Sequence, residues 1–194
     1  MNVRRLGKSG LTLFEPVTYE DERGRFLELW NDARYRTEGV DKPFVQDNVS
    51  YSGKGVLRGL HYQWRRPQGK LISVLQGEVL DVALDLRVDH GTFGEWVAVS
   101  LSAANAHQLY IPEGFAHGFA VVSEGALVTY KCTEAYDPDA EITIAWNDPD
   151  LAITWPVADP IVSAKDRSGV LLKDVPKERW PQKKTQAPMR RGDE

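Results

Sequence analysis

The sequence predicts an all-β protein, a sandwich or barrel of many short strands. Short apolar runs recur along most of the chain, and Gly, Pro, Asn or Asp interrupts them at close intervals. This spacing is typical of sandwiches and barrels. Helical periodicity is weak by comparison. Only Asp32 to Glu38, capped by Asn31, is expected to form a short helix, with residues 149–151 as a further single turn.

The clearest strand runs from Val79 to Leu86, where apolar residues alternate with others. A period of two predicts a strand with two different environments. The face with larger side chains would carry Leu80, Val82, Leu84 and Leu86, and the other Asp81, Ala83 and Asp85. Gln76-Gly77-Glu78 precedes this strand and predicts a hairpin turn back to Leu71–Leu75. The remaining expected strands, in chain order, are Glu28–Trp30, Phe44–Tyr51, Trp96–Leu101, Gln108–Ile111, Phe119–Val122, Leu127–Thr133 and Ile142–Trp146.

The length of 194 residues fits one domain with a sizeable core. No internal repeat or linker divides the chain. Towards the end the composition turns to Lys, Gln, Pro and Arg, which predicts a poorly packed polar tail. We expect a single domain over residues 1–180 and a tail over residues 181–194.

Charge and composition exclude several classes of protein. The net charge is −4 and the pI about 5.6, whereas nucleic-acid and membrane-surface proteins usually carry a basic excess. No signal peptide and no membrane-spanning apolar stretch is visible. A single cysteine, Cys132, cannot form an internal disulfide, which fits a reducing compartment. The chain is expected to be cytoplasmic, with no nucleic-acid or membrane partner.

Three basic residues stand close to one another in the best strand region. Arg58 and His61 lie within Val56–Gln63, and Lys70 follows seven residues later. Buried charge is costly unless it is paired or used, so the segment predicts an anion-holding site with a titratable base. Strict alternation puts Arg58 and His61 on opposite faces. A bulge at Gly59 would re-aim one of them; otherwise the two serve different regions.

A metal site is the first alternative for the histidines. His117 ends the pattern Pro-x-Gly-x-x-His, which is half of the metal signature of cupins. The other half requires His-x-His, but the chain has His61-Tyr62-Gln63 there. Two histidines make a poor zinc or iron site, even if Glu78 or Asp81 were recruited, so we expect no metal. His90 and His107 are expected at the surface.

A histidine without metal can act as a general base at neutral pH. His61 would then need a carboxylate to orient it, and Ser163-Ala164-Lys165-Asp166 offers Asp166. Proton transfer on the far face of a substrate needs an acid, for which Tyr130 is a candidate. Lys70 would hold a developing enolate.

Taken together, these segments resemble the dTDP-4-dehydrorhamnose 3,5-epimerase family from about Leu13 to Asp166. Each segment alone is a weak indication, but the ordered set is specific. The matching segments are Asp21–Phe26, Gln46–Asn48, Val56–Gln63, Gln68–Leu71, Thr92–Val97, Ile111–Phe119, Tyr130-Lys131, Trp146–Pro149 and Ser163–Asp166.

The resemblance implies a cupin-type jelly-roll barrel that forms a homodimer by strand exchange and needs no metal or organic cofactor. It implies that His61 is the catalytic base with Asp166 as partner, that Tyr130 is the acid, and that Lys70 lies beside the C4 oxygen of the sugar. It also implies substrate contacts. These are Arg23 and Glu28 across the dimer, Gln46, Asn48, Arg58, His117, Glu141 and Lys165, and Tyr136 stacked on thymine.

The implied reaction inverts C3 and C5 of dTDP-4-dehydro-6-deoxy-D-glucose to give dTDP-4-dehydro-L-rhamnose, because the C4 keto group acidifies both C–H bonds. Two features depart from the family pattern. Ala135 stands where many relatives have a second aromatic residue, and Val49 replaces a commoner polar residue. Both bear on whether C3 alone is inverted. An epimerase acting only at C3, a metal-dependent cupin and a sugar-nucleotide-binding cupin without catalysis remain alternatives.

Overall fold

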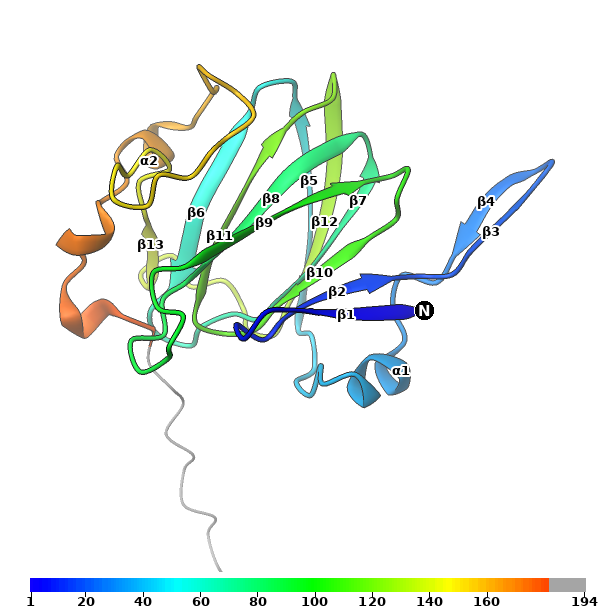
Figure 1. The fold of residues 1–194 in the computed structure, drawn as a ribbon, viewed down its shortest axis with the longest axis horizontal. Coiled ribbons are helices and arrows are strands. Elements are labelled where there is room, and N and C mark those ends of the chain that lie inside the picture. The colour runs from blue at the N-terminus through cyan, green and yellow to red at the C-terminus, as the bar shows by residue number, and fades with distance from the viewer. Residues whose placement is uncertain (182–194) are drawn as a thin grey trace, which may run out of the picture.

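Two β-sheets face each other in the computed structural model, which describes residues 1–181 (Figure 1). The six-stranded sheet has the order β1-β2-β10-β7-β12-β5, and the five-stranded sheet the order β13-β6-β11-β8-β9. All pairings within both sheets are antiparallel. Two packed antiparallel sheets with crossovers between them are the architecture of a jelly roll, so the all-β prediction is confirmed.

The strands of the six-stranded sheet are β1 (Asn2–Leu6), β2 (Leu11–Glu15), β5 (Gln46–Gly53), β7 (Lys70–Gln76), β10 (Gln108–Ile111) and β12 (Gly125–Cys132). Those of the five-stranded sheet are β6 (Leu57–Gln63), β8 (Glu78–Asp85), β9 (Trp96–Ser102), β11 (Phe115–Val121) and β13 (Glu141–Thr143). The other elements are β3 (Thr18–Asp21), β4 (Gly24–Leu27), α1 (Asp32–Thr37), α2 (Ala164–Arg167) and two 3₁₀ turns at Leu172–Asp174 and Lys177–Arg179.

The central core lies between the two sheets and takes residues from both. Ile72 and Leu109 contribute from one sheet, and Ala83 and Val121 from the other. A second cluster lies on the outer side of the five-stranded sheet, where Val82 and Leu84 pack under the C-terminal segment. The strand β8 therefore buries both of its faces, in two different environments, as its alternation predicts.

The predicted hairpin at Gln76-Gly77-Glu78 is wrong. The strands β7 and β8 on either side of it belong to opposite sheets. Gly77 has a φ of +77°, and a Cβ there would lie 2.0 Å from the carbonyl oxygen of Gly125. Gly77 thus makes a tight corner from one sheet to the other. A local turn signal cannot distinguish such a corner from a hairpin, because both need the same residues.

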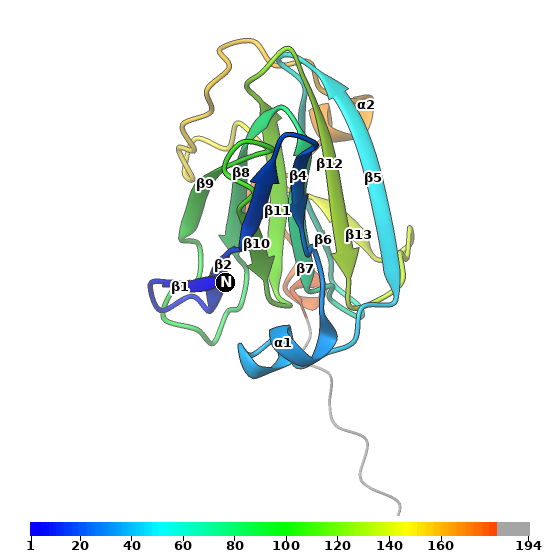
Figure 2. The same ribbon diagram turned by 90° about the vertical axis from the view of Figure 1, so that its right-hand side faces the viewer.

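The predicted helix over Asp32 to Glu38 is confirmed as α1, with the Asn31 side chain accepting a hydrogen bond from the Arg34 amide at 3.2 Å. The predicted strand Glu28–Trp30 is wrong, because β4 ends at Leu27. Figure 2 shows α1 at one end of the sheets, below β7 and β10. Pro181 is the only residue of the expected tail that the structure describes, and 182–194 lie outside the described residues.

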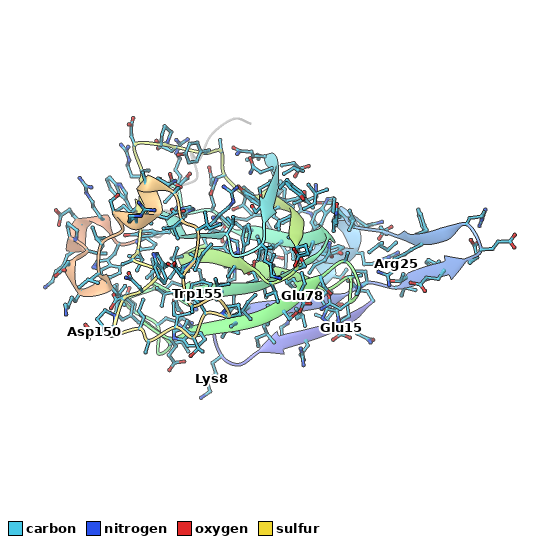
Figure 3. The ribbon with its side chains drawn as sticks, turned by 90° about the horizontal axis from the view of Figure 1, so that it is seen from above. Lys8, Glu15, Arg25, Glu78, Asp150 and Trp155 are labelled. Carbon is cyan, nitrogen blue, oxygen red and sulfur yellow. The ribbon has the colours of Figure 1, made fainter. Side chains whose placement is uncertain are left out.

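The hairpin of β3 and β4 extends away from the sandwich, as Figures 1 and 3 both show. It carries two large apolar side chains in solvent, Tyr19 at 63% and Phe26 at 69% exposure. Arg25 ties the hairpin to the body by donating to the carbonyl oxygens of Ala103 and Ala104. An exposed apolar hairpin of this kind indicates an interaction surface.

No helix within residues 1–181 is long and apolar enough to cross a membrane.

Candidate active site

A cavity of about 360 Å³ opens between the two sheets. Its walls come from strands far apart in sequence, and most of its lining is polar. It is lined by ten of the predicted site residues: Gln46, Asn48, Arg58, His61, Lys70, His117, Tyr130, Tyr136, Glu141 and Lys165. Asp166 lies behind His61, while Arg23 and Glu28 lie elsewhere.

His61 and Asp166 form a close pair at the cavity wall. His61 Nε2 lies 2.5 Å from Asp166 Oδ1, and only 3% of the Asp166 side chain is exposed. The helix α2 positions Asp166, because Ser163 caps it and accepts a hydrogen bond from the Asp166 amide at 3.0 Å. With Nε2 engaged by a carboxylate, Nδ1 is the ring atom left to exchange a proton.

Burial raises the pKa of the Asp166 carboxyl, but hydrogen bonds from His61, Ser163 and the Gly59 backbone outweigh burial. The pKa of Asp166 is therefore lowered, and the group stays a carboxylate at neutral pH. A carboxylate on Nε2 orients the imidazole ring. The predicted partnership of His61 with Asp166 therefore has its geometry in place.

A break in register at Gly59 brings Arg58 and His61 to the same cavity. His117 pairs with His61 and Phe119 with Arg58, so two residue steps on β11 match three on β6. Gly59 has a φ of +111°, and a Cβ there would lie 2.6 Å from Gly118 Cα. Only glycine combines that φ with so close a backbone approach. Between the two alternatives raised by the sequence, the bulge is the correct one.

His117 belongs to a second imidazole–carboxylate pair. His117 Nε2 lies 2.8 Å from Asp81 Oδ2, and both side chains are buried. Asp81 does not line the cavity; it lies on β8, the neighbour of β11. No site role for Asp81 other than a recruited metal ligand follows from the sequence.

Lys70 and Tyr130 enter the cavity from the six-stranded sheet, which faces the sheet of His61. Burial lowers the pKa of the Lys70 ammonium, and it raises the pKa of the Tyr130 phenol. Nearby Cys132 shifts the Lys70 and Tyr130 pKa values upward. Tyr130 therefore keeps its proton throughout the neutral range.

Tyr136, Glu141 and Lys165 form a polar group at the cavity rim. Glu141 Oε2 accepts hydrogen bonds from the Tyr136 hydroxyl at 2.7 Å and from Lys165 Nζ at 2.8 Å. Glu141 Oε1 lies 4.0 Å from His61 Nδ1. Burial alone would raise the pKa of Glu141. Lys165, Tyr136 and His61 outweigh this effect, so the pKa of Glu141 is lowered. The hydrogen bond to Glu141 raises the pKa of Tyr136 to about 12.

Amide side chains cover the β5 side of the cavity. Gln46 Nε2 donates to Asn48 Oδ1 at 2.9 Å, and Gln46 Oε1 accepts from the Tyr136 amide at 2.8 Å. Asn48 Nδ2 lies 3.7 Å from Cys132 Sγ. These amides offer donors and acceptors to a polar ligand and tie the aromatic residue Tyr136 to β5.

Arg23 and Glu28 are not part of this cavity in the single chain. Arg23 lies in the turn of the projecting hairpin, where its side chain is 86% exposed and pairs with Asp21 at 2.5 Å. Glu28 follows the hairpin and pairs with Arg34 at 2.8 Å. Neither side chain lines the cavity within its own chain.

Gln63, the residue in place of a metal-binding imidazole, anchors a loop. Its amide nitrogen donates to the carbonyl oxygens of Arg66 and Ala135, and its oxygen accepts from the Asp137 amide at 2.9 Å. Among residues 1–181, no three His, Cys, Asp or Glu side chains are grouped so that they could hold a metal ion. Glu78 instead accepts from Ser100 at 2.7 Å.

Five lining residues were missed by sequence reasoning: Ser50, Gln68, Gly118, Phe119 and Cys132. Alternation offered a signal for two of them. Ser50 follows Gln46 and Asn48 at a spacing of two on β5, and Cys132 follows Tyr130 at the same spacing on β12. His90 is exposed and His107 partly exposed, so neither lies in the cavity.

Comparisons with known proteins agree on one family. Residues 6–174 match the family model described as dTDP-4-dehydrorhamnose 3,5-epimerase. The chain is 50% identical over 177 residues to the dTDP-4-dehydrorhamnose 3,5-epimerase of Pseudomonas aeruginosa, a match covering 90% of this chain and 98% of that protein.

Solved structures give the same result. The crystal structure of dTDP-6-deoxy-D-glucose-3,5-epimerase from Legionella pneumophila, in complex with dTDP-4-keto-L-rhamnose, superposes with a TM-score of 0.91 at 48% identity. That match covers 94% of this chain and 98% of the other. ChmJ, a 3′-monoepimerase from Streptomyces bikiniensis in complex with dTDP-quinovose, matches at 34% identity with a TM-score of 0.82, covering 87% and 86% of the two chains.

Proposed function

The chain belongs to the dTDP-4-dehydrorhamnose 3,5-epimerase family, and from that premise we propose that it inverts C3 and C5 of dTDP-4-dehydro-6-deoxy-D-glucose, giving dTDP-4-dehydro-L-rhamnose. One observation carries the proposal. His61 and Tyr130 project from opposite sheets into one cavity, with Lys70 beside them. Inversion of a carbon centre needs a base and an acid on opposite faces of it, and this arrangement supplies both.

His61 is the proposed base. Its Nε2 is held by Asp166, so Nδ1 takes the proton from C3, and the electrons of the C–H bond move into the C4 carbonyl to form an enolate. Asp166 stabilises the imidazolium that results. The same group then serves C5, whose hydrogen the C4 keto group also acidifies.

Tyr130 is the proposed acid. Its phenol delivers a proton to the opposite face of the enolate carbon, and the C4 carbonyl re-forms. Burial raises the phenol pKa, so the group is protonated when the enolate arrives. Solvent then returns a proton to Tyr130 and removes one from His61.

Lys70 is proposed to stabilise the enolate oxygen at C4. A cationic donor held in a partly desolvated cavity interacts strongly with charge that develops during the reaction. Lys70 is 9% exposed and lies in the cavity wall. Its interaction is strongest with the enolate, which is the condition for accelerating the chemical step.

The nucleotide part of the substrate is proposed to lie along the rim. Arg58 and Lys165 would face the pyrophosphate, because arginine and lysine are the usual partners of phosphate oxygens. Gln46, Asn48, His117 and Glu141 would contact polar groups of the substrate, and Tyr136, 49% exposed at the rim, would stack on thymine.

We further propose a homodimer in which the β3–β4 hairpins exchange. The hairpin projects from the body with Tyr19 and Phe26 exposed. Arg23 at its tip lies outside the cavity of its own chain, so Arg23 and Glu28 would reach the nucleotide bound by the partner. A cytoplasmic location is proposed as well, since the single cysteine fits a reducing compartment.

A second candidate is inversion at C3 alone, the activity named for ChmJ. Ala135 and Val49 bear on this choice, because departures from the family pattern at these positions would alter the placement of the sugar ring. The level of identity to the 3,5-epimerases favours the first candidate.

Proton NMR of dTDP-4-dehydro-6-deoxyglucose with the protein in deuterium oxide tests both. We expect deuterium at C3 and C5 and appearance of the L-rhamno product. Deuterium at C3 alone would establish the second candidate. Binding of the nucleotide sugar without any deuterium exchange would show that the protein is a sugar-nucleotide-binding module without catalysis.

A further inference from the structure

Lys70 is the first residue of β7 and lies at the end of two ladders. Its pairs with Cys132 on β12 and with Ile111 on β10 are the last of those ladders. A residue in this place has paired neighbours on one side only. The backbone of Lys70 is therefore held firmly only if the residues just before β7 are anchored as well.

The side chain of Thr133 provides such an anchor at Gly69. The Gly69 amide donates to Thr133 Oγ1 at 2.7 Å, and the Thr133 amide donates in return to the Gly69 carbonyl oxygen at 2.9 Å. Thr133 is 5% exposed, and a buried amide without a partner is costly. The Thr133 hydroxyl thus supplies the acceptor that a further ladder residue would otherwise supply.

Gly69 and Thr133 are also in close contact. A Cβ on Gly69 would lie 3.1 Å from Thr133 Cγ2, which is shorter than the usual separation of packed carbon atoms. A further hydrogen bond joins the same two segments, from Gln68 Nε2 to the Glu134 carbonyl oxygen at 2.9 Å. The chain that leads into β7 is thus tied to the chain that leaves β12 at two successive residues.

Glu113 sets the direction of the Thr133 hydroxyl. Thr133 Oγ1 donates to Glu113 Oε1 at 3.0 Å, and the same oxygen lies 2.8 Å from Lys42 Nζ. A hydroxyl has a single proton, so with that proton on Glu113 a lone pair is left for Gly69. Four connecting segments are held together by these contacts. Each is followed, within four positions, by a residue of the proposed site: Gln46, Lys70, His117 and Tyr136.

We propose that Thr133 is a positioning residue of the active site, whose hydroxyl, directed by Glu113, holds the chain before β7 so that the Lys70 ammonium meets the C4 oxygen of the sugar. The catalytic part of this inference rests on the proposed function. Thr133 lies outside the cavity lining, so it acts on the reaction only through Lys70. A displacement of about 1 Å can cost on the order of 10²-fold in rate.

Thr133→Val tests the role of the hydroxyl, because valine has a similar shape without the polar group. With dTDP-4-dehydro-6-deoxyglucose as substrate, we expect kcat to fall by about tenfold or more and KM to stay within about twofold, since Lys70 interacts most strongly with the enolate. Thr133→Ser keeps the hydroxyl and should retain most of the wild-type kcat. An unchanged kcat in Thr133→Val, or an equal loss in Thr133→Ser, would overturn the proposal.

Hydrogen exchange gives a readout that does not need turnover. In Thr133→Val the Gly69 amide loses its acceptor, so its exchange in deuterium oxide, followed by NMR, should be faster by about tenfold, the order expected for loss of one hydrogen bond. The amide of Ile72, inside β7, should keep its rate. Unchanged exchange at Gly69, or an equal increase at Ile72, would overturn the anchor. If the wild type shows no turnover, the proposed function fails, while exchange at Gly69 still decides whether Thr133 holds this segment.

Thr12→Val is the matched control. Thr12 is also buried, at 1% exposure, and its hydroxyl accepts from Arg5 Nη1 at 2.6 Å, but it lies on β2 outside the cavity lining. Its loss should lower thermal stability and leave kcat at the wild-type value. An equal fall of kcat in Thr12→Val would mean that loss of any buried threonine hydroxyl slows turnover, and would overturn the specific role of Thr133.

Glu113→Ala tests the direction of the hydroxyl, and it decides the matter if Thr133→Val does not fold. It leaves Thr133 in place but removes the acceptor of its proton, so kcat should fall at unchanged KM, by less than in Thr133→Val. Groups that act through one contact have effects that do not add, so the double variant should be no slower than Thr133→Val alone. Unchanged kcat in Glu113→Ala, or additive losses in the double variant, would overturn the coupling of Glu113 to Lys70 through Thr133.

Discussion

His61 and His117 lie directly opposite each other on the adjacent strands β6 and β11, and each turns its Nε2 to a different buried carboxylate. The two rings therefore both line the cavity, yet belong to separate pairs. One pair is accessible to act on a substrate, since His61 is 24% exposed, and the other is buried.

Replacing the proposed base should abolish the reaction. His61→Asn keeps a polar side chain of similar size but removes the basic nitrogen, and we expect deuterium exchange at C3 and C5 to fall by at least about 10²- to 10⁴-fold. Proton NMR in deuterium oxide measures this. His107→Asn, a change outside the cavity, should exchange at the wild-type rate, and retained exchange in His61→Asn would remove His61 from its role.

Replacing the proposed acid should separate exchange from inversion. In Tyr130→Phe the base still removes the C3 proton, so deuterium should enter C3 with the original configuration while the inverted product is lost. Analysis of the configuration of the deuterated sugar nucleotide checks this. Tyr110→Phe alters another buried tyrosine outside the cavity and should invert normally; inversion by Tyr130→Phe would assign the acid elsewhere.

The bulge at Gly59 should tolerate no side chain. Gly59→Ala combines an unfavourable φ with a Cβ 2.6 Å from the His117 carbonyl oxygen, and we expect a loss of at least about 2 kcal/mol in unfolding free energy. Urea denaturation measures it. Gly91→Ala is the control, because nothing lies within 4 Å of a Cβ there, and equal stability of the two variants would contradict the close approach.

Acid should weaken the wild type more than Asp166→Asn. The folded-state pKa of Asp166 is lowered, so its contribution to stability is complete above the unfolded value of about 3.9 and is lost as pH falls through the folded value. Unfolding free energies of both proteins, measured from pH 6 down to about pH 2, should converge at the acid end. Parallel curves would show that Asp166 gains nothing from its partners.

Mixed dimers should recover activity from two inactive variants. If Arg23 serves the partner's site, a dimer of Arg23→Ala and His61→Asn chains has one intact site. Random reassortment makes about half of the dimers mixed, and each mixed dimer has one intact site of its two. We therefore expect about one quarter of wild-type activity. His61→Asn mixed with Tyr130→Phe is the control, since both residues come from one chain and no site is intact. Recovery of activity in the control, or no recovery in the mixture of Arg23→Ala and His61→Asn chains, would contradict the exchange of hairpins between subunits.

Much of the fold was predictable because its signals are local. Alternation located β8 and its two environments, and a capping asparagine located α1. The partners of a strand are not local, so Gln76-Gly77-Glu78 carries the local signal of a hairpin although β7 and β8 belong to opposite sheets. The N-terminal strands β1 and β2 were not predicted, and the strand expected at Glu28–Trp30 is absent.

The candidate site was predictable where residue type matches known chemistry, as for His61 and Asp166. The site was not predictable where the role of a residue depends on which side chains the fold places next to it. Asp81 looks like any outward-facing polar residue of an alternating strand until β11 places His117 beside it. Gln63 is the opposite case. It stands at the position of a metal-binding histidine in the cupin signature, but its side chain anchors a loop.

The pair of His61 and Asp166 joins residues 105 positions apart in the chain. A contact at such separation requires a long loop to close, which costs conformational entropy. The strands β6 and β11 must pair and the C-terminal segment must dock on them before a base exists. Catalytic competence in this protein therefore depends on the docking of its C-terminal segment, and a nascent chain that has not yet released its α2 segment lacks the carboxylate partner of His61.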